Sequence, residues 1–298
     1  MLVTASWGST FILLRGVVSR MPAADFLAAR FLVAAVAVWL LAPGSVGRLS
    51  AVERRRGVVL GLVYGAAQLL QTIGLGSTAA SVSGFLTGLY VVLTPLLAAV
   101  LLGARLGRRV WAAVGVATLG MAVLSLQGLA LGGGEALTLA GALFYALHVV
   151  GLGFWSRDGA TMGLTVVQLA TVAVVCTVGA LPGGLTLPTT GSDWVGLVYM
   201  AVVAGALALV VQTWAQAQIS STRAAVFMTM EPVWAAAFAV VLGGESLGAR
   251  ALLGGALVLA AMVGVERASS TTAASSRPPA RTAASATSTP AAALASVP

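Results

Sequence analysis

Long, uninterrupted runs of apolar residues limit how this chain can fold more than any other feature of its sequence. One run covers residues 221–242, where Arg223 and Glu231 are the only charged side chains. A helix of about 20 residues spans the roughly 30 Å of a bilayer's hydrocarbon core. The runs are continuous rather than alternating, which indicates helices and not barrel strands. Only 8% of the residues are charged, against about 25% in a soluble domain, so we predict an integral membrane protein.

The runs predict an all-α polytopic membrane protein with ten transmembrane helices. Pro, Gly and Arg mark the breaks, including Pro43-Gly44, the glycines at 132–134, and a basic loop that holds Arg48 and the arginines at 54–56. Residues 267–298 hold mainly Ala, Ser, Thr and Pro, and we predict a disordered tail there. The expected helices cover residues 2–18, 25–41, 57–76, 81–102, 110–126, 135–154, 163–181, 194–215, 221–242 and 249–265.

The arginines predict the orientation in the membrane. With ten helices and the N-terminus inside, twelve arginines fall on the cytoplasmic side and two, Arg20 and Arg250, fall outside. We therefore expect both termini in the cytoplasm of a bacterial-type cell, with the chain in the inner membrane. The net charge of +8 is explained by this orientation and not by nucleic-acid binding. The first helix starts almost at Met1, so we expect the natural chain to begin a few residues earlier. The twelve inner arginines are Arg48, Arg54, Arg55, Arg56, Arg105, Arg108, Arg109, Arg157, Arg223, Arg267, Arg277 and Arg281.

The two halves of the chain carry a similar pattern. Gln71, the stretch 77–80 and Pro95 recur in order as Gln212, the stretch 221–225 and Pro232. Five helices in each half, 1–130 and 131–266, would place the second half upside down relative to the first. Inverted repeats around a polar residue at mid-membrane are typical of secondary transporters.

Several short motifs resemble the EamA branch of the drug/metabolite transporter superfamily. The resemblance implies two five-helix units around a central cavity, a small-molecule substrate such as an amino acid, a nucleoside or a toxic compound, frequent outward transport, and a homodimer through helices 110–126 and 249–265. One departure is that Ala104-Arg105 stands in the first half where the second half has Gly244-Glu245. The matching motifs are residues 7–11, Arg30-Phe31, the stretch 71–95 with residues 84–90 in it, 212–216, Glu231-Pro232, Gly244-Glu245 and Gly254.

Glu231 is the first candidate site residue, because it lies near the middle of a predicted helix. Burial of a carboxylate favours its protonated form, so Glu231 could carry a proton or bind a cation or an amine. Alternatively, it is a structural carboxylate hydrogen-bonded to a neighbouring helix. Pro232 beside it could open the helix at a site or only bend it.

His148 and Arg30 are the next candidates. His148 is the sole histidine and could relay protons, or it could be a packed, hydrogen-bonded residue. Arg30 could pair with an anionic substrate or with Asp25, or its side chain could reach the headgroups. For Arg15 we expect the last of these.

Amide and aromatic side chains complete the candidate set. Gln71 and Gln212 could hydrogen-bond a substrate or tie helices together. Tyr90 and Trp214 could line an aromatic pocket, as could Tyr64 and Tyr145, although such residues more often serve packing. The sequence suggests no metal ligands and no cofactor site.

Other classes of membrane protein fit the sequence less well. An intramembrane enzyme needs a nucleophile and a base, paired aspartates or metal ligands, and the chain has one His, no Lys and one Cys, Cys176. A channel would need rings of charge or a carbonyl filter. A purely structural scaffold would leave Glu231 unexplained. We therefore expect a proton-coupled exporter that works by alternating access, with a channel, an enzyme or a scaffold as the alternatives.

Overall fold

The computed structural model describes residues 2–102, 107–127, 130–156, 159–219 and 221–275. Within them, six helices are long and apolar enough to cross a membrane, and shorter apolar helices accompany them. The predicted all-α membrane architecture is confirmed at this level. The six are Ala23–Leu41, Ala51–Leu75, Ala80–Leu101, Gly133–Trp155, Thr161–Gly183 and Gly191–Gln218, and the shorter ones are Leu2–Val18, Glu231–Val241 and Ala249–Gly264.

Five helices begin and end within two residues of the predicted positions. Proline, glycine and polar loops bound these apolar runs on both sides, so the sequence marks their ends clearly. The five are α1 (Leu2–Val18), α2 (Ala23–Leu41), α6 (Arg108–Ser125), α7 (Gly133–Trp155) and α8 (Thr161–Ala180).

The helix α3 (Ala51–Leu75) begins six residues earlier than predicted. Ser50 and Glu53 form a capping box, in which the Ser50 hydroxyl accepts from the Glu53 N–H and the Glu53 carboxylate accepts from the Ser50 N–H. The arginines at 54–56 therefore lie in the first turns of α3, and the prediction that they form a loop was wrong.

Two predicted helices are each broken into two. Residues 81–102 form α4 (Ala80–Gly88) and α5 (Tyr90–Leu102), and residues 221–242 form α11 (Ser221–Met228) and α12 (Glu231–Val241). Pro232 has no N–H to donate to the Met228 carbonyl four residues back, and α11 ends at Met228. Pro95 lies inside α5, shortly after the first break. Apolar content alone does not reveal these breaks.

A third predicted helix, 194–215, contains an irregular centre. It comprises α9 (Gly191–Ala201), the π-helical segment η2 (Val202–Leu207) and α10 (Ala208–Gln218). Short π-helical turns inside α-helices frequently occur at functional sites. We therefore expect η2 to lie beside the functional site.

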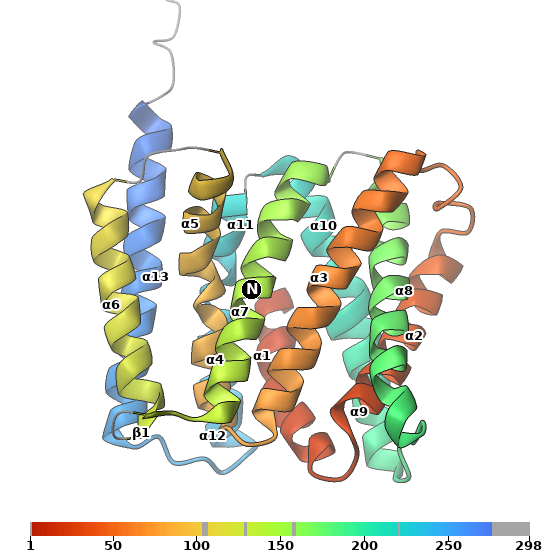
Figure 1. Ribbon diagram of the computed structural model, residues 1–298, viewed down its shortest axis with the longest axis horizontal. Coiled ribbons are helices and arrows are strands. Elements are labelled where there is room, and N and C mark those ends of the chain that lie inside the picture. Colours follow the sequence, from red (N-terminus) through yellow and green to blue (C-terminus); the bar gives the residue numbers. More distant parts are fainter. Residues whose placement is uncertain (1, 103–106, 128–129, 157–158, 220, 276–298) are drawn as a thin grey trace, which may run out of the picture.

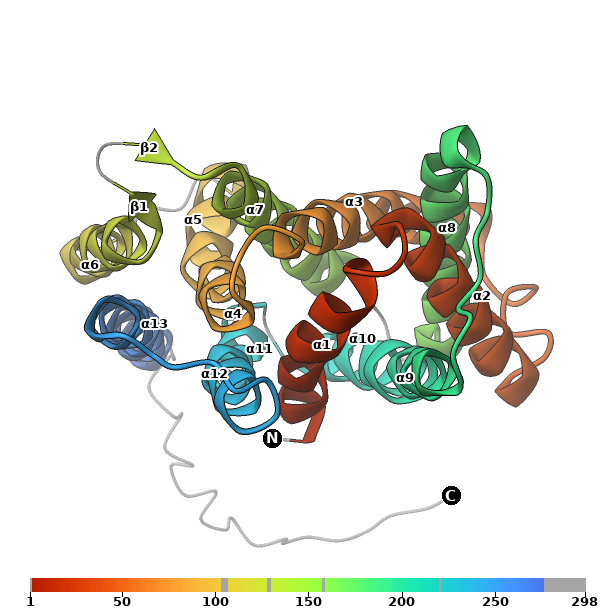
Figure 2. The ribbon, with the colours of Figure 1, turned by 90° about the horizontal axis from the view of Figure 1, so that it is seen from below.

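The helices stand roughly side by side, as Figures 1 and 2 show. α6 packs against α13 (Ala249–Ser275) at one end of the molecule, and α2 packs against α8 at the other. In the centre α12 packs against α1 and α4. A Cβ atom added at Gly8 of α1 would lie 2.5 Å from the Cβ of Trp234, so only glycine permits this close approach.

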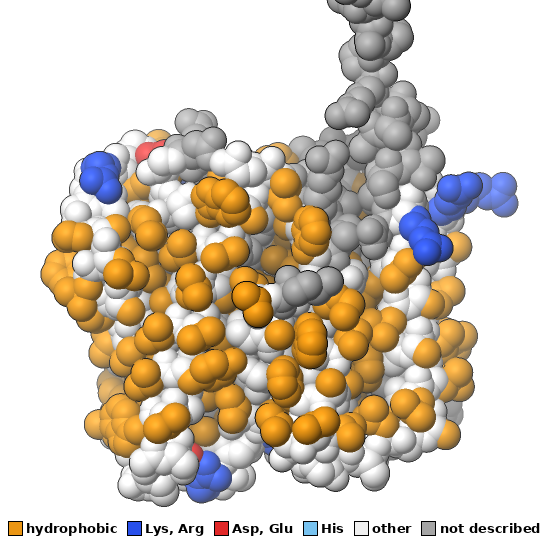
Figure 3. Space-filling model, turned by 180° about the vertical axis from the view of Figure 1, so that it is seen from behind, with side chains coloured by type: hydrophobic (Ala, Val, Ile, Leu, Met, Phe, Trp, Pro, Cys, Tyr) orange, Lys and Arg blue, Asp and Glu red, His pale blue; other side chains and the backbone are white. Residues whose placement is uncertain are grey.

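Short elements connect the helices at the lower end of the view in Figure 1. The two-residue strands β1 (Leu126–Gln127) and β2 (Ala130–Leu131) form an antiparallel hairpin between α6 and α7, and the 3-10 turn η1 (Leu181–Gly183) follows α8. Hydrophobic side chains cover most of the face seen in Figure 3, with arginines near its upper and lower margins. This distribution suits a protein surrounded by lipid.

The chain differs from prediction at its C-terminal end. α13 continues to Ser275, ten residues beyond the expected end at 265, and so covers residues 267–275 of the predicted tail. Residues 276–298 lie outside the described residues, as do Ala104-Arg105, Arg157, Arg277 and Arg281.

Candidate substrate-binding site

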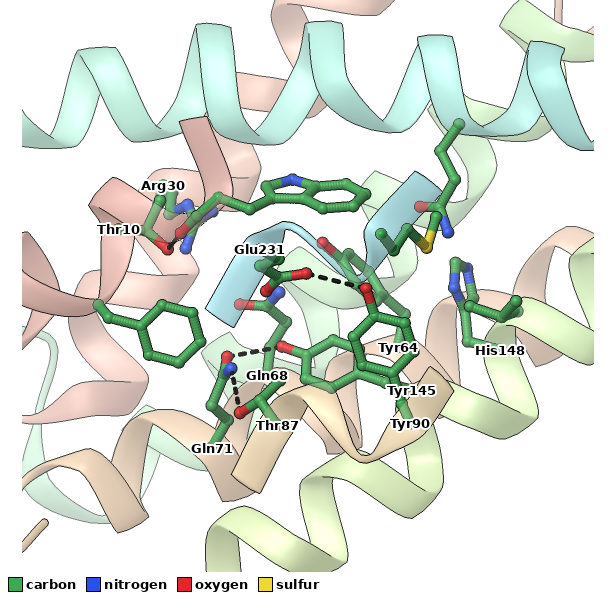
Figure 4. A pocket seen from close by; sticks show the side chains of 15 residues that line it. Thr10, Arg30, Tyr64, Gln68, Gln71, Thr87, Tyr90, Tyr145, His148 and Glu231 are labelled. Atoms are coloured by element: carbon green, nitrogen blue, oxygen red, sulfur yellow. Dashed lines mark hydrogen bonds between the residues drawn. The ribbon is translucent and has the colours of Figure 1, made fainter. Parts of the chain in front are cut away.

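A cavity lies at the level of the helix breaks. Its volume is about 40 Å³, which is space for a few water molecules. Figure 4 shows its polar and aromatic side chains pointing toward one another. The fifteen lining residues are Trp7, Thr10, Phe11, Arg30, Tyr64, Gln68, Gln71, Thr87, Tyr90, Tyr145, His148, Val149, Gln212, Met228 and Glu231.

Glu231 lies at one break and Tyr90 at the other. Glu231 is the first residue of α12, Tyr90 is the first residue of α5, and Tyr90 Oη donates a hydrogen bond of 2.9 Å to Glu231 Oε2 (Figure 4). Glu231 is only 7% exposed. A helix N-terminus favours negative charge, so this position can hold a carboxylate or a protonated carboxyl group. The breaks thus bring polar groups from distant parts of the chain together.

A second hydrogen-bond chain runs along the cavity wall. Tyr145 Oη donates to Gln71 Oε1 over 2.7 Å, and Gln71 Nε2 donates to Thr87 Oγ1 over 2.9 Å (Figure 4). These bonds join α7, α3 and α4. Gln71 therefore ties helices together, as one of its two interpretations predicts, and it also lines the cavity.

Aromatic rings form another wall. Tyr64 stacks on His148 with ring centroids 4.8 Å apart, and it meets Tyr145 edge-on at 5.8 Å. Tyr145 in turn lies 6.2 Å from Tyr90. Such a wall offers apolar faces together with hydroxyl groups, which suits a solute that has both apolar and polar parts.

His148 is held by a buried amide. Its Nε2 lies 2.8 Å from Gln168 Oε1, and Gln168 Nε2 donates to the Leu164 carbonyl over 3.2 Å. Because Oε1 is a carbonyl oxygen, it accepts, and His148 Nε2 carries the proton. The Gln168 contact thus selects this tautomer, which supports the expectation of a packed, hydrogen-bonded histidine.

Arg30 is buried in the cavity wall. It is 2% exposed, and its Nε donates to the Met200 carbonyl over 3.1 Å. The predicted alternative of a pair with Asp25 was wrong, because Asp25 accepts from the Thr186 N–H at 2.9 Å and from its hydroxyl at 2.5 Å. Nor does Arg30 extend to the headgroups, since the guanidinium lines the cavity (Figure 4).

Arg15 is bound away from the cavity. Its Nη1 lies 2.5 Å from Oε1 of Glu245, a residue in the connection between α12 and α13. The sequence did not predict this ion pair, and the Arg15 side chain is 43% exposed. Glu245 also accepts from the backbone N–H of Ala80 at 2.8 Å and from the Ser81 hydroxyl at 2.7 Å. One carboxylate thus fastens the start of α4 to α1 and to the α12–α13 connection.

The side chains of α10 divide between the cavity and the outer surface. Gln212 lines the cavity and donates to Gln216 over 3.2 Å, and Gln216 donates to the Val149 carbonyl over 2.8 Å. Trp214 is 58% exposed and does not line the cavity. Residues two apart on an α-helix point in roughly opposite directions, so Gln212 and Trp214 cannot both face inward. The structure brings together the other six candidates and leaves Trp214 outside.

Sequence reasoning missed several lining residues. Trp7, Thr10 and Phe11 of α1 belong to the cavity, as do Thr87 and Met228. Trp7 Nε1 donates to the Ala204 carbonyl in η2 over 2.9 Å. The spacing of Trp7, Thr10 and Phe11 at three and four residues is the available signal, because it places all three on one helix face. Among the described residues, no three His, Cys, Asp or Glu side chains are grouped to hold a metal ion.

The apolar spans and the buried polar cavity between broken helices define a multi-pass membrane protein of the transporter class. The chain belongs to the EamA-like transporter family, which matches residues 1–126 and again residues 132–267. This family is part of the drug/metabolite transporter superfamily, so the resemblance found in the sequence is confirmed.

Two known proteins are similar to the chain over most of its length. A protein of Archaeoglobus fulgidus described as an "Uncharacterized transporter" is 26% identical over 88% of this chain and 82% of the relative. A solved structure titled "Crystal structure of protein" covers 92% of this chain and 96% of its own, with a TM-score of 0.63 and 19% identity. The second likeness concerns the fold alone.

Proposed function

We propose that the chain is a secondary transporter that exports small metabolites, such as amino acids or drug-like compounds, by alternating access around the central cavity. The observation that carries this proposal is the meeting of Glu231 and Tyr90 at two helix breaks. Transporter sites are typically built at mid-membrane from discontinuous helices. The cavity joins residues matched by both copies of the family, since Tyr90 lies in the first match and Glu231 in the second.

The proposed topology has ten spans in two inverted five-helix repeats, residues 1–130 and 131–266. Two family matches of similar length support the repeats. The excess of arginines on one predicted side supports cytoplasmic termini in the inner membrane. Five spans in each repeat would invert the second relative to the first, as alternating access uses.

The size of the cavity supports a moving carrier. Pockets that bind small molecules have volumes of about 300–1,000 Å³, whereas this cavity has about 40 Å³. A metabolite would enter only if helices separate. The breaks at Leu89 and at Thr229-Met230 are natural points of movement, because regular helical hydrogen bonding is interrupted there.

Glu231 is the proposed coupling residue. A carboxyl group in a low-dielectric cavity is stabilised either by a proton or by a cation. A substrate amine that binds Glu231 would displace the proton, and a returning proton would displace the amine. Such competition would exchange outgoing solute for incoming protons. His148 is placed beside Tyr64 to assist, but its bond to Gln168 favours a structural role.

Channel and enzyme functions receive less support. A cavity of about 40 Å³ is no open pore, and a channel would need a continuous polar path. For an enzyme, the lining residues would have to include an activated nucleophile or a carboxylate pair, and Glu231 is the sole carboxylate among the lining residues. The family points to transport without catalysis.

A homodimer through α6 and α13 is the proposed assembly. These helices pack on each other at one end of the molecule (Figure 2). Trp111 and Leu119 of α6, and Leu252 of α13, are each more than half exposed there. The variant Trp111→Cys should cross-link between two copies. Cys176 is buried and makes an internal control. Cross-linking that occurs only at protein concentrations high enough for random collision, and disappears on dilution, would contradict the dimer.

The test of transport is metabolite efflux from a bacterial host. Metabolites inside and outside cells are measured by mass spectrometry for the wild type, Glu231→Gln and the empty vector, at equal membrane levels. Glu135→Gln is the matched control, because Glu135 lies at the start of α7 and does not line the cavity. We expect one chemical class to leave faster with wild type and Glu135→Gln only. No change in any compound would contradict export.

A further inference from the structure

We infer that Arg30 binds the anionic group of the transported solute, and that the solute is therefore a zwitterion whose ammonium group binds at Glu231. This inference rests on the proposed transport function and names the class of its substrate. It concerns two charged side chains in one cavity that do not pair with each other.

The charge of Arg30 lacks a protein counter-ion. Its side chain is 2% exposed, and no carboxylate of the described residues lies within 4.0 Å of it; the ion pairs found there are Arg15–Glu245 and Arg20–Asp193. Its guanidinium also lies 4.9 Å from the ring centre of Phe31. A buried charge without a partner is costly, so an anionic ligand would stabilise this position.

One hydrogen bond to the protein backbone fixes the guanidinium of Arg30. Nε donates to the carbonyl of Met200, which lies in the last turn of α9 directly before η2. Trp7 docks on the same segment through Ala204. This attachment uses one of the five guanidinium N–H groups. Arg30 is one of the residues that line the cavity (Figure 4). The fork of remaining donors suits a carboxylate, which accepts two parallel hydrogen bonds.

The ammonium group of the solute would hydrogen-bond to side-chain oxygen atoms of Glu231 and Gln68. Glu231 offers its carboxylate, and Tyr90 occupies only Oε2. Gln68 lines the same cavity and is 6% exposed, and its buried Oε1 has no hydrogen-bond partner among the described residues. An ammonium group has three donors and no acceptor, so it would satisfy both oxygens.

A zwitterion would neutralise both Arg30 and Glu231 at once. A simple amine would satisfy Glu231 and leave Arg30 without a counter-charge. A simple carboxylate would satisfy Arg30, and Glu231 would then keep its proton. The separation of Arg30 and Glu231 into unpaired groups therefore favours a solute with both charges over either alone.

The test compares three sets of solutes in vesicles that contain the purified full-length protein. The sets are the common neutral amino acids, the amines that lack their carboxylates, and the acids that lack their amines. Flux is measured for the wild type, Arg30→Gln and Arg30→Lys. Arg56→Gln is the control, because Arg56 lies in the first turns of α3 and does not line the cavity. Vesicles without protein give the background for each solute.

We expect wild-type flux for zwitterions and none above background for the matched amines and acids. Arg30→Gln should raise the KM for the zwitterion about 10- to 100-fold, since a hydrogen bond to a charged group contributes about 1.5–3 kcal/mol. Arg30→Lys should recover part of that loss, which a residue needed only for folding would not show. Arg56→Gln should match the wild type.

Two results would overturn the inference. Equal flux of amines and zwitterions would show that the protein does not recognise the anionic group of the solute. The proposed transport function would still stand. Flux confined to other compounds found in the efflux experiment, without a carboxylate or comparable anion, would do the same. Absence of flux for every solute, together with absence of efflux from cells, would contradict transport itself.

Discussion

Tyr90 donates a hydrogen bond of 2.9 Å to Glu231, and each residue is the first of a half-helix. The two positions are 141 residues apart in sequence. The bond therefore links the point where α4 gives way to α5 with the point where α11 gives way to α12. Any motion that separates these breaks must stretch or release this bond, and any ligand of Glu231 must share the carboxylate with Tyr90.

Removal of the Tyr90 hydroxyl should impair transport without unfolding the protein. Tyr90→Phe keeps the ring and deletes one hydrogen bond to a carboxylate, a loss of about 1.5–3 kcal/mol. We expect transport to fall about tenfold or more in vesicles. Tyr199→Phe is the control, because Tyr199 hydrogen-bonds Ser9 at 2.9 Å outside the cavity. Equal activity of the two variants would contradict a role for the Tyr90 bond.

Pro232 should matter for motion more than for stability. Pro232→Ala supplies an N–H that can bond the Met228 carbonyl, so it would allow α11 to continue into α12. We expect an equal or higher Tm and slower transport, because α11 and α12 would join. Pro43→Ala in the turn after α2 is the control. A Pro232→Ala protein with normal turnover would show that the break is not a point of movement.

The two tryptophans of the candidate motifs should behave differently. Trp7 lines the cavity and bonds η2, whereas Trp214 is 58% exposed on the outer face. Trp7→Ala should therefore reduce transport strongly, and Trp214→Ala should leave it near the wild-type rate. Flux assays at matched protein amounts separate the two. A larger defect in Trp214→Ala would contradict the placement of the site.

Glu245 should stabilise the protein in a pH-dependent manner. Burial raises the pKa of this carboxyl, but hydrogen bonds from Ser81 and the Ala80 N–H, with the charge of Arg15, more than offset that effect and hold the pKa below 4.5. Because the folded-state pKa is lowered, the stabilisation is present above about pH 4.5 and is lost as the pH falls through the folded-state value.

Thermal unfolding in detergent tests this prediction. At pH 7 the Tm of Glu245→Gln should lie below that of the wild type, and the gap should shrink toward pH 4. Arg20→Gln is the comparison, because it removes the ion pair with Asp193 and leaves the contacts of Glu245 intact. A gap for Glu245→Gln that is constant over the whole pH range would rule out this linkage.

Much of the architecture follows from the apolar runs of the sequence. The ends of α1, α2, α6, α7 and α8 were predicted closely, because Pro, Gly and polar residues bound them on both sides. The break at Leu89 was not predicted, since both halves of that broken helix are apolar. The break at Thr229-Met230 matches one of the two alternatives given for Pro232, an opening of the helix. Likewise the π-helical segment η2 leaves no mark in composition, and its hydrogen bond from Trp7 is a long-range contact.

The candidate site was predictable only as a set of residue types. Glu231 and Arg30 stand out because ionisable side chains inside a span are rare. Their partners are long-range contacts that no local pattern reveals: Tyr90 lies in another part of the chain, and Asp25 binds Thr186 rather than nearby Arg30. Trp214 lies two residues from Gln212, and therefore on the outer face of α10.

The most direct test of the account is proton movement coupled to solute flux in vesicles. The solute is one found by the efflux experiment, and an internal pH dye follows the protons for the wild type and Glu231→Gln. The account predicts that wild-type solute efflux is accompanied by proton entry and changes with pH, and that Glu231→Gln shows neither. Equal, pH-dependent transport by both proteins would contradict the claim that Glu231 exchanges a proton for the solute.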